Sequence, residues 1–183
     1  MRATGPQLEP TAEGRLGVRR PALADLDAVF RIHSDPRTNT HNPTGPDRGR
    51  DASRERLREW IEHWERYGFG YWVVETLAPA GGVVGFTGVR HSTWLGEQVL
   101  NLYYRYAPQV WGQGYAAEGA RHAVSWARTR FPAIPVHAYT TVGNVASQRT
   151  ALAAGLVRRP DLEGEHDGIH AVVFVSHWPA TDL

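Results

Sequence analysis

Apolar residues recur every three or four positions in four stretches of the chain, and this spacing is typical of amphipathic helices. The stretches cover residues 23–32, 53–67, 116–131 and 144–154. Ser53 is expected to cap the second helix and Asn144 the fourth. Gly155 follows the fourth helix directly, where a left-handed residue commonly ends a helix. The pattern therefore predicts four helices, two of them with identifiable caps at the start.

Shorter runs rich in β-branched and aromatic residues, separated by turn-forming residues, favour strands. They cover residues 16–20, 70–76, 83–91, 99–107, 136–141, 156–159 and 169–176. The strands between residues 70 and 107 follow one another across short turns, which indicates an antiparallel meander, and the last two strands are expected to pair across residues 160–168. A meander followed by alternating strands and helices predicts a mixed α/β sheet with helices on both faces.

Two segments lie outside this pattern. Residues 1–14 lack the apolar core of a signal peptide and are predicted to be a flexible polar tail ahead of one domain, residues 15–183. Residues 36–51 are rich in Pro, Gly, Asn and Asp and are predicted to be a loop. Loops of this length are unusual in a compact domain and are often functional.

Composition agrees with a single globular domain and narrows the list of partners. The chain has 183 residues, of which 42% are hydrophobic and 21% charged. The formal net charge of +1 predicts no general attraction to nucleic acid or to a membrane surface. No apolar run approaches the ~20 residues of a membrane helix. We therefore expect a cytoplasmic protein.

Two residue types are missing, and each absence excludes a class of chemistry. All basic residues other than histidine are arginines, so a Schiff-base lysine and the lysine of a Walker-type phosphate loop are excluded. There is no cysteine, so disulfides, thiolate metal sites and cysteine nucleophiles are excluded as well.

A pair of glycines, Gly112 and Gly114, lies between the strand at residues 99–107 and the helix at residues 116–131. Two glycines let the main chain approach an anion closely, and the first amides of the helix point their N–H groups toward it. Such a turn can hold a pyrophosphate without a lysine. A tight strand–helix turn with no ligand explains the same spacing, because a lone Gly-x-Gly is a weak signal.

His166 and His170, with Glu163, Glu165 and Asp167 beside them, have the composition of a metal site. This stretch is predicted to be a hairpin rather than a helix, so a spacing of four residues need not bring the two imidazoles together. A solvated acidic turn is the better interpretation, and we expect no metal.

The sequence around the glycines supplies further matches. The run from Tyr104 to Gly119 (YRYAPQVWGQGYAAEG) resembles the coenzyme A loop of the GNAT superfamily of N-acetyltransferases, most closely its ribosomal-protein N-terminal (RimJ/RimL-type) branch. Residues 144–156 (NVASQRTALAAGL) resemble the branch's following helix, and residues 19–26 (RRPALADL) resemble the start of its first helix. The three matches occur in the family's order and span residues 16–178.

The resemblance implies a GNAT-like twisted sheet, mixed but mostly antiparallel, whose fourth and fifth strands are parallel and splayed. Those strands would be residues 99–107 and 136–141, and the pantetheine arm of acetyl-CoA would pair with the first of them. The cofactor-binding residues implied by the match are Tyr106, Ala107, Gln109, Trp111, Gly112, Gln113, Gly114, Tyr115 and Asn144. Structural alternatives exist for two of them, a core aromatic for Tyr106 and a helix cap for Asn144.

The catalytic candidates are Ser147, Asn101 and Glu97. Ser147 matches a serine of the branch that donates to the departing thiolate, although a first-turn serine can also bond its own backbone. Asn101 stands where the branch often has a glutamate base, and it cannot act as a base. Glu97 shares the face of Asn101 in a regular strand, but it is also explained, and we favour this interpretation, as a solvated turn residue. The base is left unassigned, because His137 and Tyr139 on the neighbouring strand, or water, are alternatives.

The resemblance implies an acetyl-CoA-dependent N-acetyltransferase that acts by direct attack of an amine in a ternary complex, and branch members often form homodimers. The acceptor would be a protein N-terminus or a small amine, and the candidate acceptor contacts are His41, Asn42, Trp72 and Arg90. A non-catalytic acyl-CoA-binding regulatory module is the alternative that Asn101 motivates. A nucleotide-phosphate binder fits less well, because no ribose-binding acidic residue follows the loop at the required distance.

Overall fold

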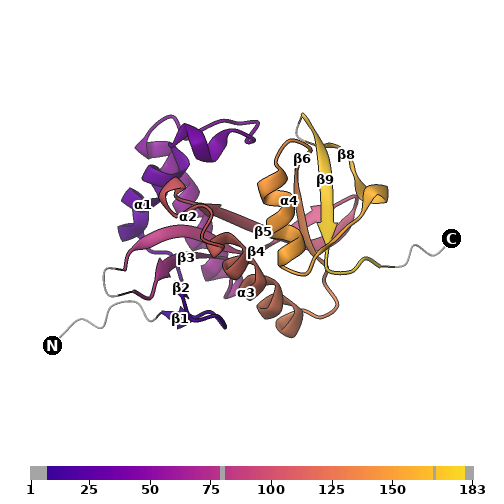
Figure 1. Cartoon of the computed structure of the whole chain (residues 1–183), viewed down its shortest axis with the longest axis horizontal. Helices are drawn as coiled ribbons and strands as arrows, with labels where there is room; N and C mark the ends of the chain where they lie inside the picture. The colour runs from indigo at the N-terminus through magenta and orange to yellow at the C-terminus, as the bar shows by residue number, and fades with distance from the viewer. Residues whose placement is uncertain (1–7, 79–80, 167, 180–183) are drawn as a thin grey trace.

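The computed structural model describes residues 8–78, 81–166 and 168–179, and Figure 1 shows their arrangement. Within these residues nine strands form one sheet, in the order β1-β2-β3-β4-β5-β6-β9-β7, with β8 paired to β9. The strands are β1 (Glu9–Pro10), β2 (Leu16–Arg19), β3 (Tyr71–Thr76), β4 (Val83–Trp94), β5 (Glu97–Tyr106), β6 (Val136–Thr141), β7 (Val157–Arg158), β8 (Gly164–His166) and β9 (Ile169–Val175). Only the β5–β6 pair is parallel within the described sheet, which confirms the predicted mixed, mostly antiparallel topology.

The helices cover both faces of the sheet, as predicted. They are α1 (Leu26–His33), α2 (Arg50–Tyr67), α3 (Tyr115–Arg130) and α4 (Val145–Ala153). Ile32 of α1 and Trp60 of α2 lie in one buried cluster with Val73. Ala120 of α3 lies in a second cluster with Val74. Since Val73 and Val74 are successive residues of β3, the two clusters are on opposite faces. Among the described residues, no helix has both the length and the apolar character needed to cross a membrane.

The parallel pair at the centre of the sheet separates soon after it forms. Its register contains only Leu100 with Val136 and Asn101 with His137. Beyond these pairs β5 continues toward Tyr106 beside β4, while β6 continues to Thr141 beside β9. The two parallel strands, predicted at residues 99–107 and 136–141, therefore splay apart as expected. Their separation exposes an edge of β5 in the middle of the sheet.

The hairpin that joins β4 to β5 is tighter than predicted. Its loop contains only Leu95 and Gly96, whose φ angles are 49° and 85°. Two successive residues with positive φ match the two-residue turn that fits the twist of paired strands. Trp94 and Glu97, which lie outside the predicted strands at residues 83–91 and 99–107, are paired to each other at the ends of β4 and β5.

The predicted tail of residues 1–14 is wrong for its second half. Residues 1–7 lie outside the described residues, but Glu9 and Pro10 pair with β2. The Thr11 amide donates to the Leu16 carbonyl at 2.9 Å, and its hydroxyl donates to Glu118 of α3 at 2.5 Å. Neither Glu nor Pro favours a strand, so the sequence carries no local signal for this pairing. The contact with β2 and α3 decides it.

Two smaller predictions also need correction. Ser53 does not cap α2, which begins at Arg50, and its hydroxyl instead donates to the carboxylate of Asp47 at 2.7 Å. The predicted turn at residues 160–168 contains the 3-10 helix η4 (Pro160–Leu162) and β8, so β9 is paired on both sides. Glu165 faces His170 in that hairpin, whereas Asp167 lies outside the described residues.

Candidate active site

The edge of β5 beyond Asn101 carries main-chain amides that β6 does not pair. The Leu100 amide donates to the Pro135 carbonyl at 2.8 Å, so even-numbered residues of β5 present their main-chain groups on the β6 side. The ladder ends at Asn101 and His137. The amides of Tyr104 and Tyr106 therefore face the opening between the two strands. An extended molecule with amide groups can bind here as an added strand.

The loop after β5 leads from this edge to the start of α3. It contains the 3-10 helix η3 (Pro108–Val110) and the two glycines, both with a φ angle of 78°. A side chain would be strained at such a φ angle, which explains the glycines. No protein atom lies within 4 Å of the position of a Cβ at Gly112, and at Gly114 only the Arg15 guanidinium does, at 3.6 Å. The loop and the first turn of α3 thus leave room for an anion near their amides.

Arg15 and Glu118 hold this loop in place, and the sequence analysis did not find them. The Arg15 guanidinium donates to the Gln113 carbonyl at 2.9 Å and to Glu118 at 2.7 Å. Glu118 is almost fully buried in the first turn of α3 and also accepts from the main-chain amide of Leu16 at 3.2 Å. A carbonyl that is held by Arg15 leaves the neighbouring amides to face outward. No sequence pattern links residues this far apart.

The other predicted cofactor residues of this loop differ in what they expose. Tyr106 is buried, and its hydroxyl would lie 2.1 Å from a Cβ at Gly119, so only its main chain faces the opening. Ala107 is buried as well, and its amide donates to the Val84 carbonyl of β4. Trp111 is exposed, and its indole N–H donates to the Tyr106 carbonyl at 2.9 Å.

The remaining side chains of this loop are open to solvent or partly so. Gln109 and Gln113 are exposed, and Tyr115 is half-buried with the Arg15 guanidinium 5.1 Å from its ring centre. All of the predicted loop residues are therefore gathered at the start of α3, as the spacing required. Their polar side chains are free to adjust to a ligand, while the main chain is held.

The start of α4 faces the same opening from the other side. Asn144 is the N-cap, and its Oδ1 accepts from the Ser147 amide at 3.2 Å, which confirms the predicted cap. The Tyr104 hydroxyl of β5 donates to the Ser147 carbonyl at 2.9 Å and lies 3.0 Å from the Ser147 hydroxyl. Burial raises the pKa of Tyr104 to about 12, so this hydroxyl stays protonated near neutral pH. The structure therefore joins Ser147 to Tyr104, a partner that the sequence analysis did not assign.

Odd-numbered residues of β5 project to the other face of the sheet, toward α1 and α2. The Asn101 amide nitrogen donates to the Tyr71 hydroxyl at 3.1 Å. The rings of Tyr71 and Tyr103 are stacked with their centres 4.7 Å apart. Burial raises the pKa of Tyr71 to about 12, so its hydroxyl is neutral. Since the Asn101 nitrogen is occupied, its carbonyl oxygen is the group left to accept a hydrogen bond.

His33 closes this face from α1 and has a defined tautomer. Its Nδ1 lies 2.9 Å from the Val29 carbonyl, so this nitrogen carries the proton. Its Nε2 then accepts from the Tyr103 hydroxyl at 2.7 Å. Burial, and secondarily the charge of Arg105, lowers the pKa of His33 to about 3. A histidine with such a low pKa is a poor base near neutral pH, so this pair orients Tyr103 rather than removing protons.

The predicted acceptor contacts fall into two groups. Arg90 lies opposite Asn101 in the β4–β5 ladder, with its guanidinium 5.4 Å from the centre of the Tyr71 ring. His41 is exposed and lies 3.4 Å from the Thr141 hydroxyl at the end of β6, beside the opening. Asn42 donates to the carbonyl oxygen of Gly45 at 2.7 Å and shapes the loop.

Trp72 belongs to the opposite face and is not brought together with these residues. It is buried, with its ring 5.4 Å from Trp126 and 5.6 Å from His122 of α3. Successive residues of β3 point to opposite faces, so Tyr71, and not the predicted Trp72, is the aromatic residue of β3 that contacts Asn101.

Three other side chains were considered as proton acceptors near Asn101, namely Glu97, His137 and Tyr139. Glu97 is exposed at the hairpin tip, four residues and about 13 Å along the strand from Asn101. His137 is buried with its ring 4.4 Å from Trp94, and burial lowers its pKa to about 4. Tyr139 stacks on the same Trp94 at 5.1 Å. Glu97 is therefore too far from Asn101 to act as its base, and His137, although it pairs with Asn101 in the β5–β6 ladder, is a poor base near neutral pH.

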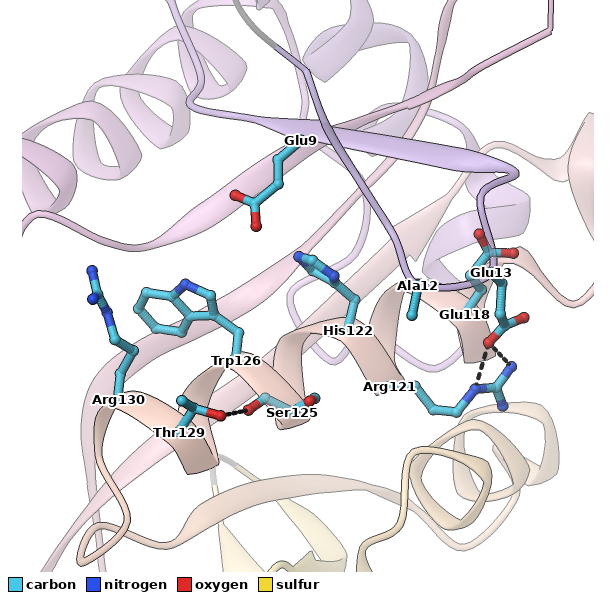
Figure 2. A pocket seen from close by; sticks show the side chains of 10 residues that line it. All are labelled: Glu9, Ala12, Glu13, Glu118, Arg121, His122, Ser125, Trp126, Thr129 and Arg130. Atoms are coloured by element: carbon cyan, nitrogen blue, oxygen red, sulfur yellow. Dashed lines mark hydrogen bonds and ion pairs between the residues drawn. The ribbon is translucent and has the colours of Figure 1, made fainter.

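A separate groove of about 580 Å³ lies between β1 and the outer side of α3, as Figure 2 shows. It is lined by Glu9, His122 and Trp126 among others, and the Glu13–Arg121 ion pair, with a shortest distance of 2.6 Å, lies at one end. None of the predicted cofactor or acceptor residues lines this groove. The opening beside β5 therefore remains the candidate active site.

Comparison with known proteins identifies the family of this chain. The family model described as an acetyltransferase (GNAT) domain matches residues 15–157, which is more than half of the chain. The uncharacterized protein YkkB of Bacillus subtilis is 28% identical over 107 residues, which are 56% of this chain and 62% of that protein. The match to this relative thus spans less than two thirds of its length.

Solved structures share the fold. An acetyltransferase from Agrobacterium tumefaciens has a TM-score of 0.76 at 23% identity, and the similarity covers 97% of this chain and 98% of that one. RimL, a ribosomal-protein alpha-N acetyltransferase solved in complex with coenzyme A, has a TM-score of 0.70 at 14% identity, covering 92% and 97%. With the splayed strands and the glycine loop in place, the family match leads to one conclusion: this chain belongs to the GNAT acetyltransferase domain family, which uses acetyl-CoA.

Proposed function

We propose that this protein transfers an acetyl group from acetyl-CoA to a primary amine, by direct attack of the amine in a ternary complex. The observation that carries the proposal is the opening between β5 and β6. There, the unpaired edge of β5, the start of α3 and the Ser147–Tyr104 pair meet. Acetyl-CoA supplies an acetyl group that is already activated as a thioester. The residues of the chain need only to bind, orient and manage protons.

The residues around the opening fit this cofactor. The amides of Tyr104 and Tyr106 match the amide groups of a pantetheine arm that lies along β5 as an added strand. The free space at Gly112 and the first amides of α3 match a pyrophosphate, and the helix dipole favours its negative charge. The Asn144 side-chain nitrogen remains available as a further donor, because the cap uses only its oxygen.

Ser147 is proposed to stabilise the leaving thiolate. Because the Tyr104 hydroxyl donates to the Ser147 carbonyl, the Ser147 hydroxyl donates to the Tyr104 oxygen when no other acceptor is near. Rotation about one side-chain bond would redirect this hydroxyl to a sulfur atom in the opening. Tyr104 thus orients Ser147, and the Ser147 hydroxyl donates a hydrogen bond that stabilises the negative charge on the departing sulfur.

The acceptor amine is proposed to react in its neutral form. Asn101 cannot remove a proton, and Tyr103 and His33 are bonded to each other. The free carbonyl oxygen of Asn101 can accept a hydrogen bond from the amine N–H and so orient its lone pair toward the acyl carbon. Water then takes the proton that is released after attack. Direct attack by a neutral amine predicts a rate that rises with pH until the amine is fully deprotonated.

Finer assignments follow from the resemblance and extend the proposal. We place the protein in the RimJ/RimL-type branch, with a protein N-terminus or a small amine as acceptor, a cytoplasmic location and a possible homodimer. The matches at residues 104–119 and 144–156 support the branch, and both lie at the opening.

A non-catalytic acyl-CoA-binding module is the competing function, because Asn101 replaces the carboxylate expected there. Two measurements separate the two functions. Calorimetry with acetyl-CoA tests the cofactor site, and release of free coenzyme A with a panel of amines tests transfer. Binding with turnover supports the enzyme, binding without turnover on any amine supports the module, and no binding removes both.

A further inference from the structure

Two arginines on the Asn101 face have no carboxylate partner among the described residues. Arg105 donates to the side-chain oxygen of Asn39 at 2.5 Å and makes no ion pair there. Arg90 makes neither a hydrogen bond nor an ion pair in the same ranges, and its guanidinium lies 5.4 Å from the centre of the Tyr71 ring. Both side chains are half-buried, so solvent and small molecules can reach them.

Their neighbours show that this lack of partners is a local property. Arg56, on the same side of the sheet, is paired with Asp47 at 2.6 Å. Arg37 is paired with Asp35 at 2.6 Å. Asp47 and Asp35 are thus paired with other arginines, while Arg90 and Arg105 have no ion pair among the described residues. The exposed carboxylate of Glu97 lies at the far tip of the β4–β5 hairpin.

The two arginines lie at the two ends of a patch built from side chains of β3 and β5. Arg90 lies directly across from Asn101 in the ladder, and Arg105 is four residues, or about 13 Å, further along β5. The stacked rings of Tyr71 and Tyr103 lie between them. The charges act on this patch, since Arg105 lowers the pKa of His33 and Arg90 opposes the rise in the pKa of Tyr71.

We propose that the acceptor is a small amine that also carries a carboxylate, with its apolar part against Tyr103, the partly exposed ring of the Tyr71–Tyr103 stack, and its carboxylate bound by Arg90 or Arg105. This inference rests on the proposed acetyl transfer and names the acceptor class. A guanidinium has five N–H donors, of which Arg105 uses one, and the donor fork matches a carboxylate. A polyamine would bring further positive charge to two cations that have no counter-charge, which disfavours it.

The first test compares amines with and without the carboxylate, with each rate referred to the neutral form of the amine, because loss of the carboxylate also lowers the pKa of the amine. Release of coenzyme A is measured with the common L-amino acids, with their C-terminal amides and with spermidine. We expect kcat/KM to be about 10- to 100-fold higher for at least one amino acid than for its amide, as for a hydrogen bond to a charged group. Spermidine should be slower still. Amides or spermidine that react as fast as the best amino acid would overturn the inference and leave acetyl transfer intact.

Variants connect the preference to the two arginines. Arg90→Gln and Arg105→Gln keep a donor but remove the charge, and at least one should reduce the acid-to-amide ratio to about one, mainly through KM. The lysine variant at that position should restore part of the preference. Arg128→Gln, an exposed position on α3, changes the net charge equally and should leave the ratio unchanged. A ratio that survives in both single variants and in the double variant would exclude these arginines.

A binding measurement separates this inference from the proposed function. Calorimetry with an N-acetyl-L-amino acid and with its amide, without acetyl-CoA, should detect the acid preferentially, and the preference should fall in the affected variant. If acetyl-CoA binds but no carboxylate-bearing amine reacts and no acetylated acid binds, the acceptor class is wrong. If acetyl-CoA itself does not bind, the proposed function is wrong.

Discussion

Strand β5 contributes to the candidate site in two different ways, through its edge toward β6 and through its face toward α1 and α2. On the edge that faces β6, the useful groups are the main-chain amides of Tyr104, Tyr106 and the glycine loop. On the face toward α1 and α2, the useful groups are side chains, above all Asn101, Tyr103 and Arg105. One strand thus provides a cofactor edge made of main chain and an acceptor face made of side chains.

This difference teaches what each part of the site requires of the sequence. Main-chain amides are the same for every residue, so the cofactor edge depends on backbone shape, which glycines and helix caps determine. An acceptor face depends on which side chains meet, and they come from α1, β3, β4 and β5. The cofactor edge can be retained while the acceptor face changes, so one fold can serve many acceptors.

The largest expected effect is loss of cofactor binding after a charge is placed in the loop. Gly112→Glu should weaken acetyl-CoA binding by at least about 100-fold, because like charges brought together cost several kcal/mol. Calorimetry measures the loss. The fold should survive, since the side chain would enter open space and the positive φ costs roughly 1–2 kcal/mol.

Gly68→Glu is the matched control for that variant. Gly68 has a φ angle of 73° and likewise no atom within 4 Å of its Cβ position, but it ends α2 away from the loop. The two variants should lose similar stability, and only Gly112→Glu should lose the cofactor. Equal affinity in both would remove the glycine loop from its proposed role.

A smaller effect is expected where the two sides of the site meet. Ser147→Ala should lower kcat by about 10- to 100-fold with little change in acetyl-CoA affinity, because general-acid contributions begin near this size. Tyr104→Phe keeps the ring but removes the hydroxyl that orients Ser147, so its loss in kcat should be smaller. Single-turnover kinetics together with calorimetry separate rate from binding.

The double variant decides whether Tyr104 acts through Ser147. If it does, Ser147→Ala with Tyr104→Phe should be no slower than Ser147→Ala alone. Independent, multiplying losses would show that Tyr104 has a role of its own. An unchanged rate in Ser147→Ala would return this serine to an ordinary position in the first turn of α4.

The remaining prediction concerns the pH dependence of stability, which the two buried histidines with the most strongly lowered pKa values should dominate. The pKa values of His33 and His137 are lowered to about 3 and about 4 by burial. Since the unfolded chain binds a proton at these histidines near pH 6.5 and the folded chain does not, stability is highest above that pH. The free energy of unfolding should fall by about 1.4 kcal/mol per pH unit for each histidine as the pH drops toward 4.

Denaturant unfolding between pH 7 and pH 4 measures this slope. His137→Phe should flatten it by the share of one histidine, because neither ring nitrogen of His137 has a partner among the described residues. His177→Gln, at an exposed position, should leave the slope unchanged. A slope that does not respond to His137→Phe would show that His137 takes up its proton in the folded state.

Local signals in the sequence were sufficient for much of the fold. The spacing of apolar residues located all four α-helices, and Gly155 ends α4 with a φ angle of 86° as expected. Boundaries were less accurate at Ser53 and at Trp94, where tertiary contacts or turn geometry set the ends. The N-terminal strand β1 was missed because its two residues have no strand preference of their own.

The candidate site was predictable only in part, for the same reason. The cap at Asn144 and the positive φ angles at Gly112 and Gly114 depend on short-range geometry, so the residue types alone predict them. Trp72 was assigned to the wrong side because an aromatic residue fits either face of a strand, and only packing against α3 decides which face it occupies.

The sequence by itself determined the helices, most strands, the glycine loop and the family, because each depends on residues close together in the chain. Tertiary structure alone decided the contacts of Tyr104 with Ser147, of Arg15 with Glu118 and of Tyr103 with His33. Each of these contacts joins residues at least 40 positions apart. Hydrogen bonds and ion pairs form wherever folding brings polar groups together, and the local spacing of residues in the sequence does not predict which distant groups will meet.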